Sequence, residues 1–182
     1  RKYIHSSIVD PAIENDVLQT TRIYKPSLLR SLFDLGCSYS GELLSYNKIV
    51  GQLQDKGSIV TIANYLQVLD ESNLLAGIQK FAGDIARKYQ STPKFQVFNN
   101  ALLSAYQGHG MDKEMMNPER WGRWVESAVG SHLLNNAEED EYSVYYWRER
   151  DAEVDFVLQF RDGRTLAIEV KTGRRSDNKG LH

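Results

Sequence analysis

The chain has 182 residues, of which 41% are hydrophobic and 25% are charged, and this composition excludes a chain that is disordered throughout. Its 22 basic and 24 acidic residues give a net charge of −2, so no overall basic field indicates a nucleic-acid partner. The one cysteine, Cys37, excludes an intramolecular disulfide and a multi-cysteine zinc site. No apolar run is long enough to span a membrane and no signal peptide opens the chain, so we expect a cytoplasmic protein without a membrane partner.

Residues 1–40 are polar and rich in turn formers, with one helical pattern that begins at Pro26. Apolar residues then fall at helical spacing: Leu28, Leu29, Leu32 and Phe33. We therefore expect an N-terminal helical segment that packs against the rest of the protein. Because the chain begins without Met and ends abruptly, we also expect it to be a piece of a longer protein.

Residues 41–100 are predicted to form a winged-helix-like module. A first helix, "SYNKIVGQL", is broken by "QDKG", and a second, "SIVTIANYLQVL", begins with Ser58 as a suitable N-cap. Helical spacing in the second helix predicts an inward stripe of Ile59, Ile62, Ala63, Leu66 and Leu69. Two strand-like runs follow, "LLAGIQKF" and "KFQVF", on either side of a loop that contains Gly83, and they would form the hairpin wing.

The second helix is poorly equipped to bind DNA. Neither Arg nor Lys occurs on its predicted outward face, which carries Val60, Thr61, Asn64, Tyr65, Gln67 and Val68. DNA affinity depends largely on neutralised phosphates, and bases are often recognised by Arg. Phosphate contacts are left to basic residues on the wing, namely Lys80, Arg87, Lys88 and Lys94. We therefore expect the module to pack against protein, with DNA contact through the wing as the alternative.

A strong helix is predicted from Pro118, with Asn117 as its N-cap. Its apolar stripe is Trp121, Trp124, Val125, Ala128 and Val129. Glu126 flanks this stripe, so its carboxylate points either into a cleft beside a covered sheet or to the surface. An acidic run at residues 138–141 indicates a solvated loop, and "YSVYYW" has the content of a strand.

The stretch "EVDFVLQFRDGRTLAIEVK", residues 153–171, predicts a β-hairpin whose register can be tested by cross-strand pairing. A three-residue loop of Arg161, Asp162 and Gly163, with Gly163 in the left-handed conformation, is a common hairpin connection. It makes one face wholly apolar, by opposing Val154 to Val170, Phe156 to Ile168 and Leu158 to Leu166. A helix followed by three strands predicts an α/β or α+β layer with a mostly antiparallel meander.

In that register the other face of the hairpin opposes Asp155 to Glu169 and Glu153 to Lys171. Two opposed carboxylates lie only about 5 Å apart and repel unless a cation lies between them. Hard oxygen ligands suit Mg²⁺ or Mn²⁺, and Lys171 would stabilise the charge of an attacked phosphate or position the attacking water. The alternative is that these are edge-strand charges that discourage aggregation, with Glu153 and Lys171 as an ion pair.

An Asp followed by Glu-x-Lys on the next strand resembles the PD-(D/E)XK nuclease superfamily, with Asp155, Glu169 and Lys171 as the matching residues. More closely, "GRWVESAV", "YYWRERDAEVDFVL" and "LAIEVK" resemble the C-terminal domain of unknown function that follows an AAA+-type ATP-binding domain in many prokaryotic proteins. The helix-turn-helix pattern and "STPKFQVFNNALLSA" are also similar to that family.

This resemblance implies a winged-helix-like module at 41–100 followed by a restriction-endonuclease-like domain at 101–182 that is incomplete at its C-terminal end. Asp155 and Glu169 would hold the metal, Lys171 would assist attack, and Glu126 would be an accessory acid. ATP would bind only through an upstream ATPase domain, because the chain has no G-x-x-x-x-G-K-[ST] motif.

Two hypotheses follow for the function. The first is a metal-dependent phosphodiesterase that acts on DNA or RNA. The second is a catalytically silent domain that docks on its own ATPase or another partner and keeps only the nuclease-like shape. Either form could be oligomeric. The four histidines are scattered without ligand spacing, and no serine or cysteine nucleophile is accompanied by a catalytic base, so those chemistries are not expected.

Overall fold

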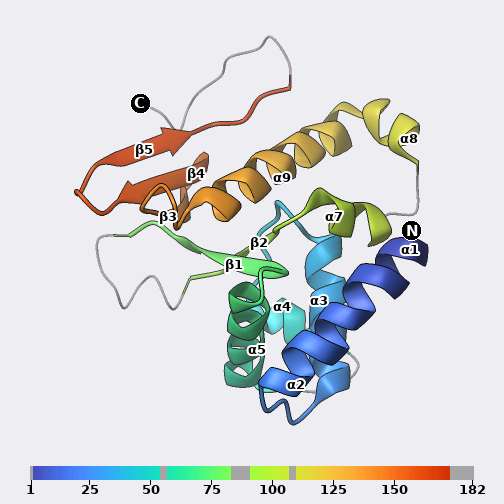
Figure 1. Cartoon of the computed structure of the whole chain (residues 1–182). Helices are drawn as coiled ribbons and strands as arrows, with labels where there is room; N and C mark the ends of the chain where they lie inside the picture. The colour runs from blue at the N-terminus through green and yellow to red at the C-terminus, as the bar shows by residue number, and fades with distance from the viewer. Residues whose placement is uncertain (1, 54–56, 83–90, 107–109, 173–182) are drawn as a thin grey trace.

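A computed structural model describes residues 2–53, 57–82, 91–106 and 110–172 (Figure 1). Helices pack around a five-stranded mixed sheet with the strand order β2-β1-β3-β4-β5. The fold is therefore mixed α/β, as predicted. Among the described ranges, no helix is both long and apolar enough to cross a membrane. The predicted wing residues Arg87 and Lys88 lie outside the described residues.

The N-terminal segment is a series of short helical elements that pack on a longer helix. These elements are α1 (Lys2–Ile4), the π-helical turns η1 (His5–Val9) and η2 (Ala12–Val17), α2 (Leu18–Thr20) and the longer α3 (Pro26–Ser38). The helix predicted to follow Pro26 is confirmed, and its four apolar residues are fully buried. Arg30 of α3 forms ion pairs with Asp10 at 2.5 Å and Glu14 at 3.0 Å, and these tie the N-terminal elements to it.

Helices α4 (Tyr46–Gln52) and α5 (Ile59–Glu71) occupy the two predicted helical stretches. The Ser58 side chain accepts a hydrogen bond from Thr61 N at 3.1 Å, which confirms the N-cap. The predicted orientation of α5 is partly wrong, because Ile59 is 46% exposed while Tyr65, assigned to the outward face, is 6% exposed. Tyr65 is buried because the segment before α3 covers it: Lys25 N donates a hydrogen bond to the Tyr65 hydroxyl at 3.0 Å.

The predicted wing is part of the main sheet. Strands β1 (Leu75–Lys80) and β2 (Lys94–Val97) form the expected antiparallel hairpin. However, β1 also pairs in parallel with β3, at Gln79↔Tyr145 and Lys80↔Tyr146. The hairpin therefore does not project as a free wing, and the sheet continues across the predicted module boundary at residue 100.

The last three strands form the expected antiparallel meander of β3 (Tyr142–Glu149), β4 (Ala152–Phe160) and β5 (Thr165–Ile168). The predicted register is confirmed where β4 and β5 pair, since Phe156 opposes Ile168 and Leu158 opposes Leu166. Gly163 has a φ of 89°, the left-handed conformation that the three-residue loop requires. Phe156 and Leu158 are buried beneath the helix that precedes the meander.

That helix is α9 (Pro118–Asn136), which follows α7 (Asn100–Tyr106) and α8 (Met111–Met115). The Asn117 side chain caps α9 by accepting from Arg120 N at 3.0 Å, as predicted. The predicted apolar stripe is only partly buried, and Ala128 is exposed. The buried face of α9 instead carries mostly small or polar residues: Trp124, Ser127, Gly130, Ser131 and Leu133.

A buried polar network explains why α9 presents small residues to the sheet. Gln96 of β2, which is fully buried, donates through Nε2 to the carbonyl oxygen of Ser127 at 2.8 Å. The Ser127 hydroxyl pairs with that of Ser40 at 2.8 Å and donates to Asn100 Oδ1 at 2.8 Å, while Ser131 donates to the carbonyl of Val97 at 2.8 Å. Such directional bonds fix how the helix lies on the sheet more narrowly than apolar contacts do.

Gly130 permits this close approach, and its replacement by alanine tests it. A Cβ there would lie 2.2 Å from Gln96 Oε1 and 2.8 Å from the Phe156 ring, whereas a Cβ at Gly122 of the same helix meets only Thr172 Oγ1 at 3.8 Å. Alanine normally stabilises a helix by up to about 1 kcal/mol over glycine, while overpacking a core costs about 1–3 kcal/mol. We expect Gly130→Ala to lower the free energy of unfolding and Gly122→Ala to raise it slightly, as measured by urea denaturation. Equal stability of the two variants would contradict the packing described here.

Candidate functional site

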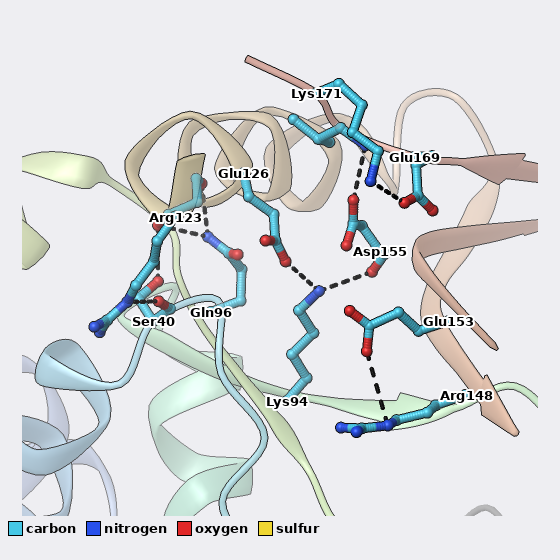
Figure 2. Close-up of polar contacts among 12 residues, drawn as sticks. Ser40, Lys94, Gln96, Arg123, Glu126, Arg148, Glu153, Asp155, Glu169 and Lys171 are labelled. Atoms are coloured by element: carbon cyan, nitrogen blue, oxygen red, sulfur yellow. Dashed lines mark hydrogen bonds and ion pairs between the residues drawn. The ribbon is translucent and has the colours of Figure 1, made fainter. Parts of the chain in front are cut away.

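The four residues predicted to form the site line one cavity of about 690 Å³ between the N-terminal half of α9 and the end of the β4–β5 hairpin. Glu126 comes from α9, Asp155 from β4, and Glu169 and Lys171 from the segment that follows β5 (Figure 2). Six carboxylates and three basic side chains line this cavity, so its surface is predominantly acidic.

Asp155 links β4 to the segment after β5 through its side chain. The backbone pairing of β4 with β5 ends at Phe156↔Ile168. Beyond that point Val170 N donates a hydrogen bond to Asp155 Oδ2 at 2.7 Å, so a carboxylate takes the place of a backbone acceptor. The other oxygen, Oδ1, accepts no hydrogen bond from any described residue. Asp155 is therefore held in a fixed orientation with one oxygen left for a ligand.

Glu169 is a largely buried carboxylate of the cavity, with 9% of its side chain exposed. Its Oε1 accepts a hydrogen bond from Lys171 Nζ. Its Oε2 is buried and has no hydrogen-bond partner among the described residues. A buried carboxylate oxygen without a partner is destabilising, so its presence in a cavity points to a cation or donor that the site would bind.

Lys171 remains a cation at neutral pH. Its hydrogen bond to Glu169 raises the pKa of the ammonium group, and the nearby charges of Glu169, Asp155 and Glu153 raise it further. A protonated lysine does not act as a general base, but it attracts a phosphate oxygen. The side chain is 43% exposed, so it can turn from Glu169 toward a ligand in the cavity.

Glu126 faces the cavity rather than the surface, which decides between the two orientations expected from the sequence. Its side chain is 21% exposed and forms an ion pair with Lys94. Burial raises the pKa of Glu126, and the charges of Asp155 and Glu153 raise it further, while Lys94 opposes the shift. Glu126 is thus a carboxylate that the protein itself neutralises.

Lys94 is the site residue that sequence reasoning missed. It was assigned to phosphate contacts on a wing, and this is wrong because its side chain is only 7% exposed. Besides the Glu126 ion pair, its Nζ donates to the Asp155 carbonyl oxygen at 3.1 Å and lies 4.7 Å from the centre of the Phe156 ring. Figure 2 shows the lysine extending from β2 toward both carboxylate-bearing elements. The sequence offered only its place at the start of the strand-like run "KFQVF", and the structure shows that all four residues of β2 are buried.

The remaining charges lie at the rim of the site. Glu153 is 59% exposed and pairs loosely with Arg148 at 3.7 Å, in the manner of a surface ion pair. Within the described residues, no group of three or more Asp, Glu, His or Cys side chains is arranged to hold a metal ion. A metal in this cavity would thus be held by the two carboxylates of Asp155 and Glu169, with water or substrate completing its coordination.

The buried Lys94–Glu126 pair yields an asymmetric prediction. Glu126→Gln leaves a buried ammonium group without its counter-charge, and we expect it to lower the free energy of unfolding by about 3 kcal/mol. Lys94→Met should have a smaller effect, because the raised pKa of Glu126 allows that group to bind a proton. The double variant should be more stable than Glu126→Gln alone in urea denaturation.

The Arg148–Glu153 pair is the matched control, since both side chains are more than half exposed. Arg148→Met and Glu153→Gln should each change stability by no more than about 1 kcal/mol. Additive effects of Lys94→Met and Glu126→Gln would show that the two groups do not interact.

Two family models match the chain, both described as domains of unknown function. DUF8612 matches residues 1–113, and DUF4143 matches residues 121–182. Neither a curated protein nor a solved structure matches it. The first region contains Lys94, and the second contains Glu126, Asp155, Glu169 and Lys171, so the site is assembled from residues of both regions.

Proposed function

The chain belongs to the DUF8612 family of unknown function, and we propose that its acidic cavity is a divalent-metal-dependent site for phosphodiester hydrolysis in DNA or RNA. The observation that carries this proposal is that Glu169, which lines the same cavity as Asp155 and Lys171, has a buried Oε2 without a hydrogen-bond partner among the described residues. The ligand that best satisfies such an oxygen beside a second carboxylate is a hard cation, with Mg²⁺ and Mn²⁺ as the candidates.

The donors present fit such an ion. Asp155 offers Oδ1 while Oδ2 is held by Val170 N, and Glu169 offers Oε2 while Oε1 is held by Lys171. Mg²⁺ is commonly bound through one or two carboxylates and keeps its other positions for water and phosphate oxygens. When bound, the ion would polarise the phosphate and lower the pKa of a coordinated water.

The protein's own residues would divide the remaining work. Asp155 is oriented by the Val170 amide, so it presents its oxygen without having to rearrange. Lys171 carries the positive charge that would offset the charge developing on the attacked phosphate. Glu126, neutralised by Lys94, supports the cavity wall and is the accessory acid of this proposal.

The resemblance of Asp155, Glu169 and Lys171 to the PD-(D/E)XK pattern supports the same assignment. We include in the proposal that residues 41–100 are winged-helix-like and that residues 101–182 are nuclease-like. We also include an ATPase domain upstream, through which ATP would act. The α9–β3–β4–β5 order agrees with the helix and three strands expected of the nuclease-like region. The α4–α5–β1–β2 order agrees with a helix pair and hairpin.

A second candidate is a catalytically silent domain that docks on its own ATPase or another partner. Its supporting observation is that Lys171 and Lys94 already pair with Glu169 and Glu126. In this alternative the ion pairs are structural, and the cavity binds no metal.

Metal titration separates the two candidates. We expect Mg²⁺ or Mn²⁺ to bind the wild-type chain in isothermal titration calorimetry, and Asp155→Asn to weaken binding roughly tenfold or more through loss of a charged ligand. Asparagine still accepts the Val170 hydrogen bond, so the fold should be kept. Asp162→Asn is the matched control, because Asp162 lies in the exposed hairpin turn outside the cavity. Identical titrations for Asp155→Asn and Asp162→Asn would favour the docking domain.

Cleavage assays test the role of Lys171. The longest natural form of the protein should cut plasmid or labelled oligonucleotides in the presence of Mg²⁺ or Mn²⁺. We expect Lys171→Met to lower kcat by about 10²-fold to 10³-fold, because a preorganised cation is lost from the reacting phosphate. Removal of Lys171 also frees Glu169 Oε1, so metal affinity is titrated in parallel and kcat is compared at saturating metal. Wild-type cleavage by Lys171→Met would contradict this role.

A further inference from the structure

A second cavity, of about 410 Å³, lies at the other end of the molecule from the β4–β5 hairpin, where the segment between α2 and α3 runs beside α5 (Figure 1). The segment at residues 21–25 forms one wall, and the other comes from α5 with Gly57 and Ser58. The α5 residues that line it are Thr61, Asn64, Tyr65 and Val68. These residues belong to the face of α5 on which the sequence has neither Arg nor Lys.

The segment before α3 brings positive charge to that face. Arg22 and Lys25 are the charged residues among the described lining of this cavity, and both are exposed. The cavity near Asp155, by contrast, is lined mainly by carboxylates. In a chain with a net charge of −2, a cavity whose described lining has basic but no acidic side chains favours an anionic ligand.

Two aromatic rings belong to the same cavity. Tyr24 is 77% exposed, and the Arg22 guanidinium lies over its ring at 5.1 Å from the centre. Tyr65 is buried, and its hydroxyl accepts from Lys25 N at 3.0 Å, which holds its ring in place. An exposed ring beside a buried one, with an arginine at the rim, suits a flat aromatic group that carries negative charge nearby.

From these observations we propose that the cavity binds one nucleotide of a single-stranded nucleic acid. The base lies between the tyrosines and the apolar walls of Ile23 and Val68, and the two phosphates that flank the nucleotide lie against Arg22 and Lys25. Asn64 and Thr61 line the cavity with groups that hydrogen-bond a base edge. The base must be unpaired, because a base within a duplex does not enter a cavity of this kind.

An acidic peptide with an aromatic residue is the competing ligand. The nucleotide is favoured because its base is planar on both faces and presents donors and acceptors at its edge, where Asn64 and Thr61 lie. The assignment concerns binding alone, so it does not depend on hydrolysis at the Asp155 cavity. It adds a contact with nucleic acid at the opposite end of the protein.

Fluorescence anisotropy with labelled oligo(dT) or oligo(U) of about 15 nucleotides tests the proposal at low salt. EDTA is included so that no metal-dependent cleavage occurs. We expect the wild-type chain to bind, with log K falling against log salt at a slope of about −1.4 for two phosphate contacts. Tyr24→Ala should weaken binding roughly 5- to 100-fold through loss of stacking, and Arg22→Gln should reduce the slope by about 0.7.

Arg161→Gln is the matched control, because Arg161 is a 77% exposed arginine in the hairpin turn outside this cavity. Since Arg22 and Tyr24 are exposed, their variants should keep the wild-type unfolding transition. Asp155→Asn should keep full oligonucleotide affinity in EDTA, so failure of the hydrolysis proposal would remain distinguishable from failure of this one.

Three results would each overturn the proposal. The first is a loss of affinity in Arg161→Gln equal to that in Arg22→Gln, which would indicate attraction by general surface charge. The second is equal affinity for a duplex of the same length. The third is an acidic tyrosine-containing peptide that binds more tightly than the oligonucleotides and is sensitive to Tyr24→Ala, which would make the ligand a protein.

Discussion

A lysine ammonium group buried beneath a helix has to be neutralised, and much of this structure follows from how Lys94 meets that requirement. Lys94 leaves the first position of β2, pairs with Glu126 of α9 and donates to the backbone of Asp155 in β4. One side chain thereby connects the edge hairpin, the covering helix and the strand that carries the cavity's central carboxylate. The region matched by DUF8612 supplies the cation, and the region matched by DUF4143 supplies its partners.

The three carboxylates of the site are held in two different ways. Glu126 and Glu169 each have a lysine partner, whereas Asp155 is held by a backbone amide. The Lys94–Glu126 pair is mostly buried, with side chains 7% and 21% exposed, whereas Lys171 is 43% exposed at the cavity. The acidic surface of the cavity is therefore partly neutralised by lysines of the protein itself.

The sequence was sufficient wherever local geometry decides the outcome. The hairpin register followed from Gly163 and the alternation of apolar residues, and the caps of α5 and α9 followed from Ser58 and Asn117. The sequence was insufficient where segments that are far apart in the chain pack together. Tyr65 is buried because residues 21–25 lie over it, and the buried face of α9 is polar because Gln96 and three serines bond there. The spacing of apolar residues within one helix does not show which distant segments pack against it.

The parallel pairing of β1 with β3 consists of two residue pairs, and β3 is irregular just beside it, between Tyr145 and Trp147. The two halves of the sheet therefore share little backbone hydrogen bonding of their own. Helix α9 connects the two halves of the sheet across this short β1–β3 pairing. It makes polar contacts with β2 and packs on Phe156 of β4. Helix α9 thus supports the sheet where its backbone pairing is shortest, and amide exchange should be faster at Gln79 and Lys80 than in the longer β3–β4 pairing.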